Sequence, residues 1–270
     1  MIITYEAGVR QIIAAAVTRA RSIVREYAIP IYGTDQGRPD HIGTSFLIEH
    51  GKGVYFLTAA HVLDHLTETP LFAGAGGNFI PVLGSFFNSL APNGNRAEDR
   101  FDFAWCRIDE SNSRLLEFCK VIPAKSISKN RIDHDKRVYL AVGYPNSKNK
   151  VPWQGHKIVP QRATYYSTFK EHKTLFDKLG ISHETHLSIA YDRKALDEDY
   201  NIVNAINPKG ISGGPFFDLG RIVSKDDLGR QTPLDPLLSG LVIEYHKAHK
   251  AMLAVKIDTI LARIDSTNTP

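Results

Sequence analysis

The feature that most constrains this 270-residue chain is a glycine-rich run at residues 210–215, Gly-Ile-Ser-Gly-Gly-Pro. Glycine permits tight backbone turns and lets another molecule come close to main-chain N–H groups. Ser212, in the middle of the run, is a weak nucleophile on its own at neutral pH and needs a base and an acid. The sequence offers both upstream: His61 ends the segment Leu-Thr-Ala-Ala-His, and Asp102 directly precedes Phe-Ala-Trp. The run therefore predicts a nucleophile whose partners lie far away along the chain.

The three segments and their order, His then Asp then Ser, resemble the motifs of the trypsin- and chymotrypsin-like serine proteases over roughly residues 43–260. The bacterial members that lack a PDZ domain look most similar. The resemblance implies a mostly β fold, a chymotrypsin-like double antiparallel β-barrel, with an N-terminal amphipathic helix and a short C-terminal helix. It divides the chain into the helix at 1–26, a first lobe at 27–132, and a second lobe at 133–270.

The same resemblance gives each motif a role. Ser212 attacks the carbonyl carbon of a peptide bond, and His61 takes the serine proton and returns it to the leaving amine. Asp102 holds His61 in the productive tautomer. The backbone N–H groups of Gly210 and Ser212 form the oxyanion hole.

Other candidates for acid or metal chemistry lie nearby. Asp64 follows His61 by three residues on a helical turn and is expected to point elsewhere, while Asp99 belongs to a charged turn. Only Asp102 immediately precedes an apolar strand. His61 and His65 stand four residues apart, a spacing that suits zinc, but no glutamate follows His61 and no cysteine is near. We therefore expect no metal and no cofactor.

The resemblance also locates a specificity pocket. Ile206 takes the position at its base, where trypsin carries an acid, and Asn207 continues its wall, so a preference for arginine or lysine is not expected. Glu244, Tyr245 and His246 follow the strand along which an extended peptide would add antiparallel. Because His246 favours an acidic side chain and Glu244 a basic one, the preference stays open.

The beginning of the chain predicts an amphipathic helix, with apolar residues at helical spacing between Val9 and Val24. We expect it to pack on the outside of the fold. A docking helix for a regulatory protein and an organelle-targeting segment are the alternatives. Ile211 occupies the position where trypsin-like zymogens carry an acid, so that activation switch is expected to be absent.

Composition narrows the partners. The chain has 33 basic and 29 acidic residues without a dense basic block, so no nucleic-acid partner is expected. No segment resembles a signal peptide or spans a bilayer, which predicts no membrane contact. Two cysteines are too few for a disulfide framework; Cys106 is expected to be a buried thiol, with a disulfide to Cys119 left open. These features predict a cytoplasmic protein that acts on a protein or peptide substrate.

Apolar patterns between turn signals predict the secondary structure. Besides helices beginning near residue 60 and at 169–179 and 258–264, we expect a polar turn at 34–40. The expected strands lie at 27–32, 44–48, 54–58, 79–83, 101–108 and 115–121 in the first lobe, and at 138–145, 157–164, 186–191, 202–206, 241–243 and 252–257 in the second. The lobes are expected to meet near residues 130–136.

These patterns favour a serine endopeptidase that works through an acyl-enzyme. Two alternatives remain open. One is a trypsin-like fold with little turnover that acts as a regulatory or peptide-binding module. The other is an α/β-hydrolase-type esterase, since residues 210–214 also match Gly-x-Ser-x-Gly, with Asp235 and His246 as possible partners of Ser212. Pro215 and the two phenylalanines after it favour an extended exit instead.

Overall fold

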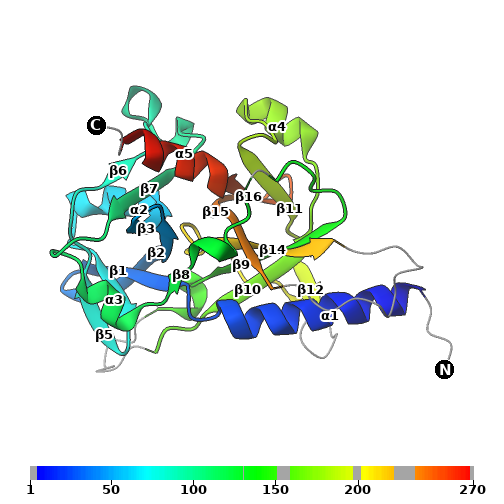
Figure 1. Ribbon diagram of the computed structural model, residues 1–270, viewed down its shortest axis with the longest axis horizontal. Coiled ribbons are helices and arrows are strands. Elements are labelled where there is room, and N and C mark those ends of the chain that lie inside the picture. The colour runs from blue at the N-terminus through cyan, green and yellow to red at the C-terminus, as the bar shows by residue number, and fades with distance from the viewer. Residues whose placement is uncertain (1–4, 130, 151–158, 197–201, 222–234, 268–270) are drawn as a thin grey trace.

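The computed structural model describes residues 5–129, 131–150, 159–196, 202–221 and 235–267. The fold is mostly β, as predicted, with two large sheets side by side and a helix near each end of the chain (Figure 1). The helices are α1 (Tyr5–Val24), α2 (Ala60–Asp64), α3 (Arg114–Phe118), α4 (Lys173–Leu179) and α5 (Ile257–Thr267).

The first sheet has eight strands in the order β5-β4-β1-β2-β3-β7-β6, with β8 pairing in parallel to β2. The hairpin of β2 and β3 pairs Ser45 with Thr58 and ends at Ala59, where α2 begins. The strands are β1 (Ile29–Asp35), β2 (Arg38–His50), β3 (Gly53–Ala59), β4 (Phe72–Ala75), β5 (Asn78–Pro81), β6 (Phe87–Asn88), β7 (Phe103–Arg107) and β8 (Val121–Ile122).

The second sheet has six antiparallel strands in the order β10-β9-β14-β15-β16-β11, and β12 and β13 form a separate pair. The strands are β9 (Arg137–Gly143), β10 (Ala163–Thr168), β11 (His186–Ala190), β12 (Lys194–Leu196), β13 (Ile202–Asn204), β14 (Pro215–Arg221), β15 (Leu237–His246) and β16 (Ala251–Lys256). The strands of the two sheets are therefore separated in sequence by residues 123–136. The division into lobes at residue 132 stays a prediction.

One apolar cluster joins the two sheets. It contains Phe46 and Leu57 from the first sheet, Leu140 and Leu253 from the second, and Ile260 from α5, all fully buried. Because these side chains share one core, the two sheets are packed against each other rather than linked only by the chain. A site between the sheets therefore has rigid walls.

Helix α1 packs along one side of the second sheet (Figure 1). Val17, Ala20 and Val24 are buried at helical spacing, and Arg21 Nε donates to Thr164 Oγ1 on β10 at 2.9 Å. The expected outside position of this helix agrees with these contacts. The regulatory partner that the sequence suggested for it stays a prediction.

Two local predictions are wrong. Residues 115–121 are not one extended segment: α3 covers Arg114–Phe118, because Leu115 and Cys119 are buried four residues apart on one helical face. The polar turn expected at 34–40 is shorter, since β1 and β2 pair as far as Asp35 and Arg38. Part of the strand expected at 157–164 lies outside the described residues, and β10 begins at Ala163.

Both cysteines are free and buried, so the disulfide left open by the sequence is not formed. In the described ranges, no helix combines the length and the apolar character needed to cross a bilayer.

Candidate active site

His61 is held at the edge of the first sheet by the short helix α2. Ala60 and Val62 on either side are fully buried and anchor the helix, while the His61 side chain keeps 39% of its surface exposed. The buried neighbours fix the backbone, so the imidazole projects from a rigid support. His61 was expected to follow an apolar strand directly. It does so, because β3 ends at Ala59 and α2 begins at Ala60.

Asp102 hydrogen-bonds to His61 through both carboxylate oxygens. Its Oδ1 accepts the backbone N–H of His61 at 2.9 Å, and its Oδ2 lies 2.6 Å from Nδ1 of the ring. A carboxylate only accepts, so Nδ1 carries the proton and Nε2 is left as the basic nitrogen. The arrangement is suited to a general base.

The pKa of His61 is raised above its ordinary value. Burial, the largest single influence, lowers the pKa of His61, while the hydrogen bond to Asp102 and the negative charge of Asp102 raise it. Asp64 raises it further, and Arg96 lowers it. The protonated form of the His61 ring is therefore stabilised by its surroundings.

The turn that carries Ser212 can be built only with glycine at its tightest points. Gly210 has φ +95°, and a Cβ there would lie 1.9 Å from Oδ1 of Asn146. Gly213 has φ +83°, and a Cβ there would lie 2.0 Å from the Thr44 carbonyl oxygen. Both contacts are impossible for a side chain, which explains the glycines that the sequence displays.

Two backbone donors of this turn are free. The N–H groups of Gly210 and Ser212 donate no hydrogen bond to any residue that the structure describes. The other N–H groups of the turn are all used: Ile211 donates to Pro208 O at 2.9 Å, Gly213 to Val242 O at 2.7 Å, and Gly214 to Ile211 O at 2.9 Å. Free N–H groups on either side of one residue can bind a single anionic oxygen.

Anchored carbonyls aim these donors. In a trans peptide the C=O and the following N–H point in opposite directions, so holding one orients the other. The Lys209 carbonyl accepts from the N–H of Asn146 at 2.8 Å, which fixes the direction of the Gly210 N–H. The Ile211 carbonyl is likewise held within the turn, which fixes the direction of the Ser212 N–H.

Thr44 on β2 ties this turn to the first sheet. Its backbone N–H donates to the Ser212 carbonyl at 3.0 Å, and its Oγ1 donates to the Gly210 carbonyl at 2.8 Å. The same Oγ1 accepts the N–H of Tyr144 at 3.0 Å. Thr44 is fully buried, and no sequence motif distinguished it from other strand threonines.

A cleft of about 380 Å³ brings the site together. His61, Asp102 and Ser212 line it, with the predicted substrate residues Asn207, Glu244 and Tyr245. Its remaining walls come from Arg96, Ala97, Asp99, Arg100, Pro208, Lys209 and Ile243. Three segments distant in sequence therefore meet at one opening.

The Ser212 hydroxyl makes no hydrogen bond within 3.5 Å in the described part of the chain, to His61 or to another group. Such contacts are commonly long without substrate and shorten in the complex. The chain leaves Ser212 through strand β14, whereas an α/β-hydrolase elbow enters a helix.

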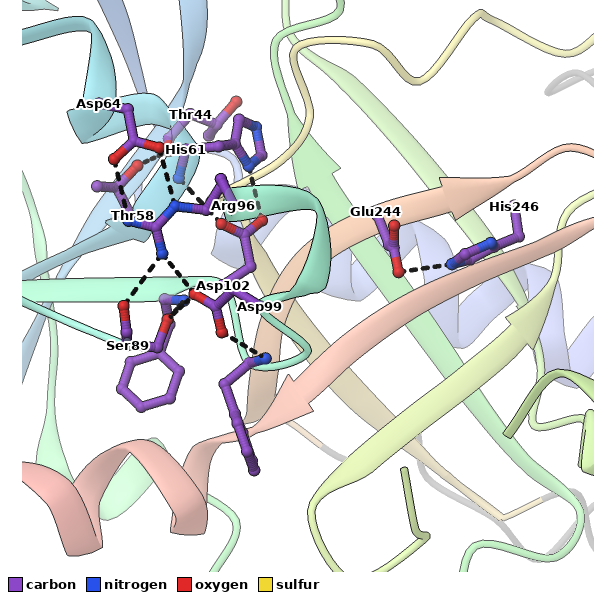
Figure 2. A network of polar contacts seen from close by, with 12 residues as sticks. Thr44, Thr58, His61, Asp64, Ser89, Arg96, Asp99, Asp102, Glu244 and His246 are labelled. Carbon is purple, nitrogen blue, oxygen red and sulfur yellow. Dashed lines mark hydrogen bonds and ion pairs between the residues drawn. The ribbon is translucent and has the colours of Figure 1, made fainter. Parts of the chain in front are cut away.

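Two predicted substrate residues are not part of the cleft wall. The Ile206 carbonyl accepts the hydroxyl of Tyr191, and His246 Nε2 lies 2.5 Å from Oε1 of Glu244. The side chains of Glu244 and His246 thus contact each other, as Figure 2 shows.

Ile211 is buried in the apolar cluster of the second sheet, which includes Tyr139, Phe216 and Val242. A side chain packed in this way contributes to folding of the turn. An acid cannot occupy this place without losing that packing and burying a charge. Position 211, where trypsin-like zymogens carry an acid, is therefore part of the hydrophobic core in this chain.

The sequence analysis did not identify Arg96 as a functional residue. Figure 2 shows its guanidinium between the carboxylates of Asp64 and Asp99, the two acids that the sequence set aside in favour of Asp102. The only signal was the charged stretch at 96–100, which is also typical of a solvated turn.

No protein-family model matches the chain, and no curated protein matches it in sequence. Among solved structures, the chain is similar to a serine endoprotease from Yersinia pestis, with a TM-score of 0.49 and 18% identity, over 98% of this chain and 67% of that one. A likeness this distant does not bear on the chemistry, which rests on the geometry above.

Proposed function

We propose that this protein is a serine endopeptidase that hydrolyses protein or peptide substrates with Ser212 as nucleophile, His61 as general base and Asp102 as its orienting acid. The observation that carries the proposal is the convergence of these three side chains on one cleft, beside two unused and firmly oriented N–H donors.

In the proposed reaction, Ser212 Oγ bonds to the scissile carbonyl carbon while Nε2 of His61 takes the serine proton. The carbonyl oxygen becomes an oxyanion and accepts from the N–H groups of Gly210 and Ser212. The imidazolium then protonates the leaving amine, the C–N bond breaks, and an acyl-enzyme remains. Water, deprotonated by His61, releases the acid and restores Ser212.

An extended peptide fits along β15. The cleft wall includes Glu244 and Tyr245 of this strand, next to Ile243. A substrate that adds as a strand places its carbonyl carbon by main-chain hydrogen bonds and is selected by side-chain pockets. This mode suits cleavage within a chain rather than at its end.

The test is covalent labelling by a fluorophosphonate probe, followed by cleavage of a diverse peptide library. We expect the wild type to be labelled at Ser212 and to cleave, and the Ser212→Ala variant to do neither. The Asp102→Asn variant should lose about 10⁴-fold in kcat, and His61→Ala about 10⁶-fold. Unlabelled wild type would favour the peptide-binding module without turnover, and labelling that survives Ser212→Ala would exclude Ser212 as the nucleophile.

A further inference from the structure

Arg96 makes the densest set of charged hydrogen bonds beside the cleft. Its Nε and Nη2 donate to the two oxygens of Asp64 at 2.8 and 3.0 Å. Its Nη1 donates to Oδ2 of Asp99 at 2.5 Å and to the Ser89 carbonyl at 3.0 Å. One planar guanidinium thus joins three separate segments, as Figure 2 shows.

The two acids that Arg96 bridges, Asp64 and Asp99, belong to the two segments that carry His61 and Asp102. Asp64 is the last residue of α2, the helix that carries His61. Asp99 opens the turn that leads to Asp102, and its side chain is 2% exposed. Arg96 therefore links the support of the imidazole to the support of the carboxylate.

The turn before β7 needs such support. Asp102 has φ +42°, a left-handed backbone conformation that is unfavourable for a non-glycine residue and persists only when its surroundings hold it. Asp99 supplies part of the hold: its carboxylate accepts the N–H of Phe101 at 3.1 Å and the hydroxyl of Ser89 at 2.5 Å. Ser89 Oγ in turn accepts the N–H of Phe103 at 3.0 Å.

We propose that Arg96 is a positioning residue for the base: by bridging Asp64 and Asp99 it keeps the His61 ring and the Asp102 carboxylate at hydrogen-bonding distance. The inference rests on the proposed function for its catalytic consequence. Its structural consequence, the state of the His61–Asp102 hydrogen bond, is measurable without turnover.

Arg100 provides a matched control. It lies four residues further on and lines the same cleft with the same charge. Its Nη1 donates to the Ala97 carbonyl of its own turn, and no ion pair of Arg100 is present among the described residues. Replacing either arginine by glutamine removes one positive charge from the lining of the cleft, but only Arg96→Gln removes the bridge.

The experiment records the low-field proton resonance of His61 Nδ1–H in wild type, Arg96→Gln, Arg96→Lys and Arg100→Gln, with kcat and KM for a fluorogenic peptide. We expect Arg96→Gln to shift or broaden the resonance and to lower kcat about 10- to 100-fold with KM nearly unchanged, the size of effect that misplacing a catalytic group produces. Arg96→Lys should restore only part, because an ammonium lacks the two-pronged geometry. Arg100→Gln should leave the resonance in place.

Two results would overturn the inference: an unchanged resonance and kcat in folded Arg96→Gln, or an equal change of the resonance in Arg100→Gln, which would assign the effect to charge alone. If Arg96→Gln does not fold, Asp64→Asn removes one end of the bridge at a half-exposed site, and an unchanged resonance there counts against the inference. Failure of the proposed function shows separately, as a wild type that the fluorophosphonate does not label.

Discussion

The hydroxyl of Thr44 gives the sharpest test of the oxyanion turn. It accepts the Tyr144 N–H and donates to the Gly210 carbonyl, and Thr44 is fully buried. Thr44→Val keeps the shape of the side chain and the backbone bond to Ser212 but removes the hydroxyl. Two buried polar groups then lose their partner, at about 1–3 kcal/mol each. Allowing for relaxation, we expect the free energy of unfolding to fall by about 2–4 kcal/mol.

The same change acts on catalysis through the backbone. The Gly210 carbonyl, which lies between the two N–H donors, loses its anchor. The Lys209 and Ile211 carbonyls still hold the two donors, so their alignment is weakened rather than lost. Complete loss of one oxyanion donor costs about 3–4 kcal/mol of transition-state stabilisation. Partial misalignment in Thr44→Val should therefore lower kcat about 10- to 100-fold and change KM little.

The assay compares wild type, Thr44→Val and Thr44→Ser in urea unfolding and in steady-state cleavage of a fluorogenic peptide. Thr44→Ser keeps the hydroxyl and should retain kcat within about threefold, although the lost methyl group costs about 1 kcal/mol of stability. A Thr44→Val variant that is destabilised yet keeps the wild-type kcat would refute the reasoning, because the hydroxyl would then serve packing alone.

Three further predictions concern titratable groups. In the proposed reaction neutral His61 is the active form, so kcat/KM should fall as the pH drops through its raised pKa, at a midpoint above about 6.5. Asp102→Asn should move that midpoint down in a pH–rate profile. Burial, with nearby cationic groups, lowers the pKa of His134 to about 4, so the unfolded chain takes up the proton first on acidification. The free energy of unfolding should decline by up to about 1.4 kcal/mol per pH unit below about 6.5, and urea midpoints equal at pH 7 and pH 5 would contradict this. Burial raises the pKa of Cys106 and Cys119 to about 12, so mass spectrometry should find iodoacetamide adducts at pH 8 only after denaturation.

The sequence predicted the parts of the site that depend on local pattern. Each of these parts is a motif of only a few residues. They are an apolar strand followed by a histidine, an acid before an apolar strand, and a serine among glycines. Their meeting at one cleft followed from the family resemblance, and the cleft that His61, Asp102 and Ser212 line is what the structure adds.

The parts that the sequence did not predict depend on contacts between distant segments. Asp64 was expected to point away from His61, but its partner, Arg96, lies 32 residues further along the chain and was not predicted. Thr44 bonds to a carbonyl 166 residues away. The local sequence pattern indicates neither of these two contacts, because the register of the strands and the path of the loops determine which groups meet. Glu244 and His246 were read as competing determinants, whereas the extended strand lets them pair with each other.

These distant contacts also couple the two halves of the candidate site. The turn of Ser212 is held by Thr44 from the first sheet, and the turn of Asp102 is held from the second, where fully buried His186 donates Nε2–H to the Arg100 carbonyl at 2.9 Å. The first sheet thus holds the Ser212 turn, which leads into the second sheet, and the second sheet holds the Asp102 turn, which leads into the first. A change that loosens the bonds between the two sheets should therefore disturb the His61–Asp102 pair and the N–H donors of the Ser212 turn at once.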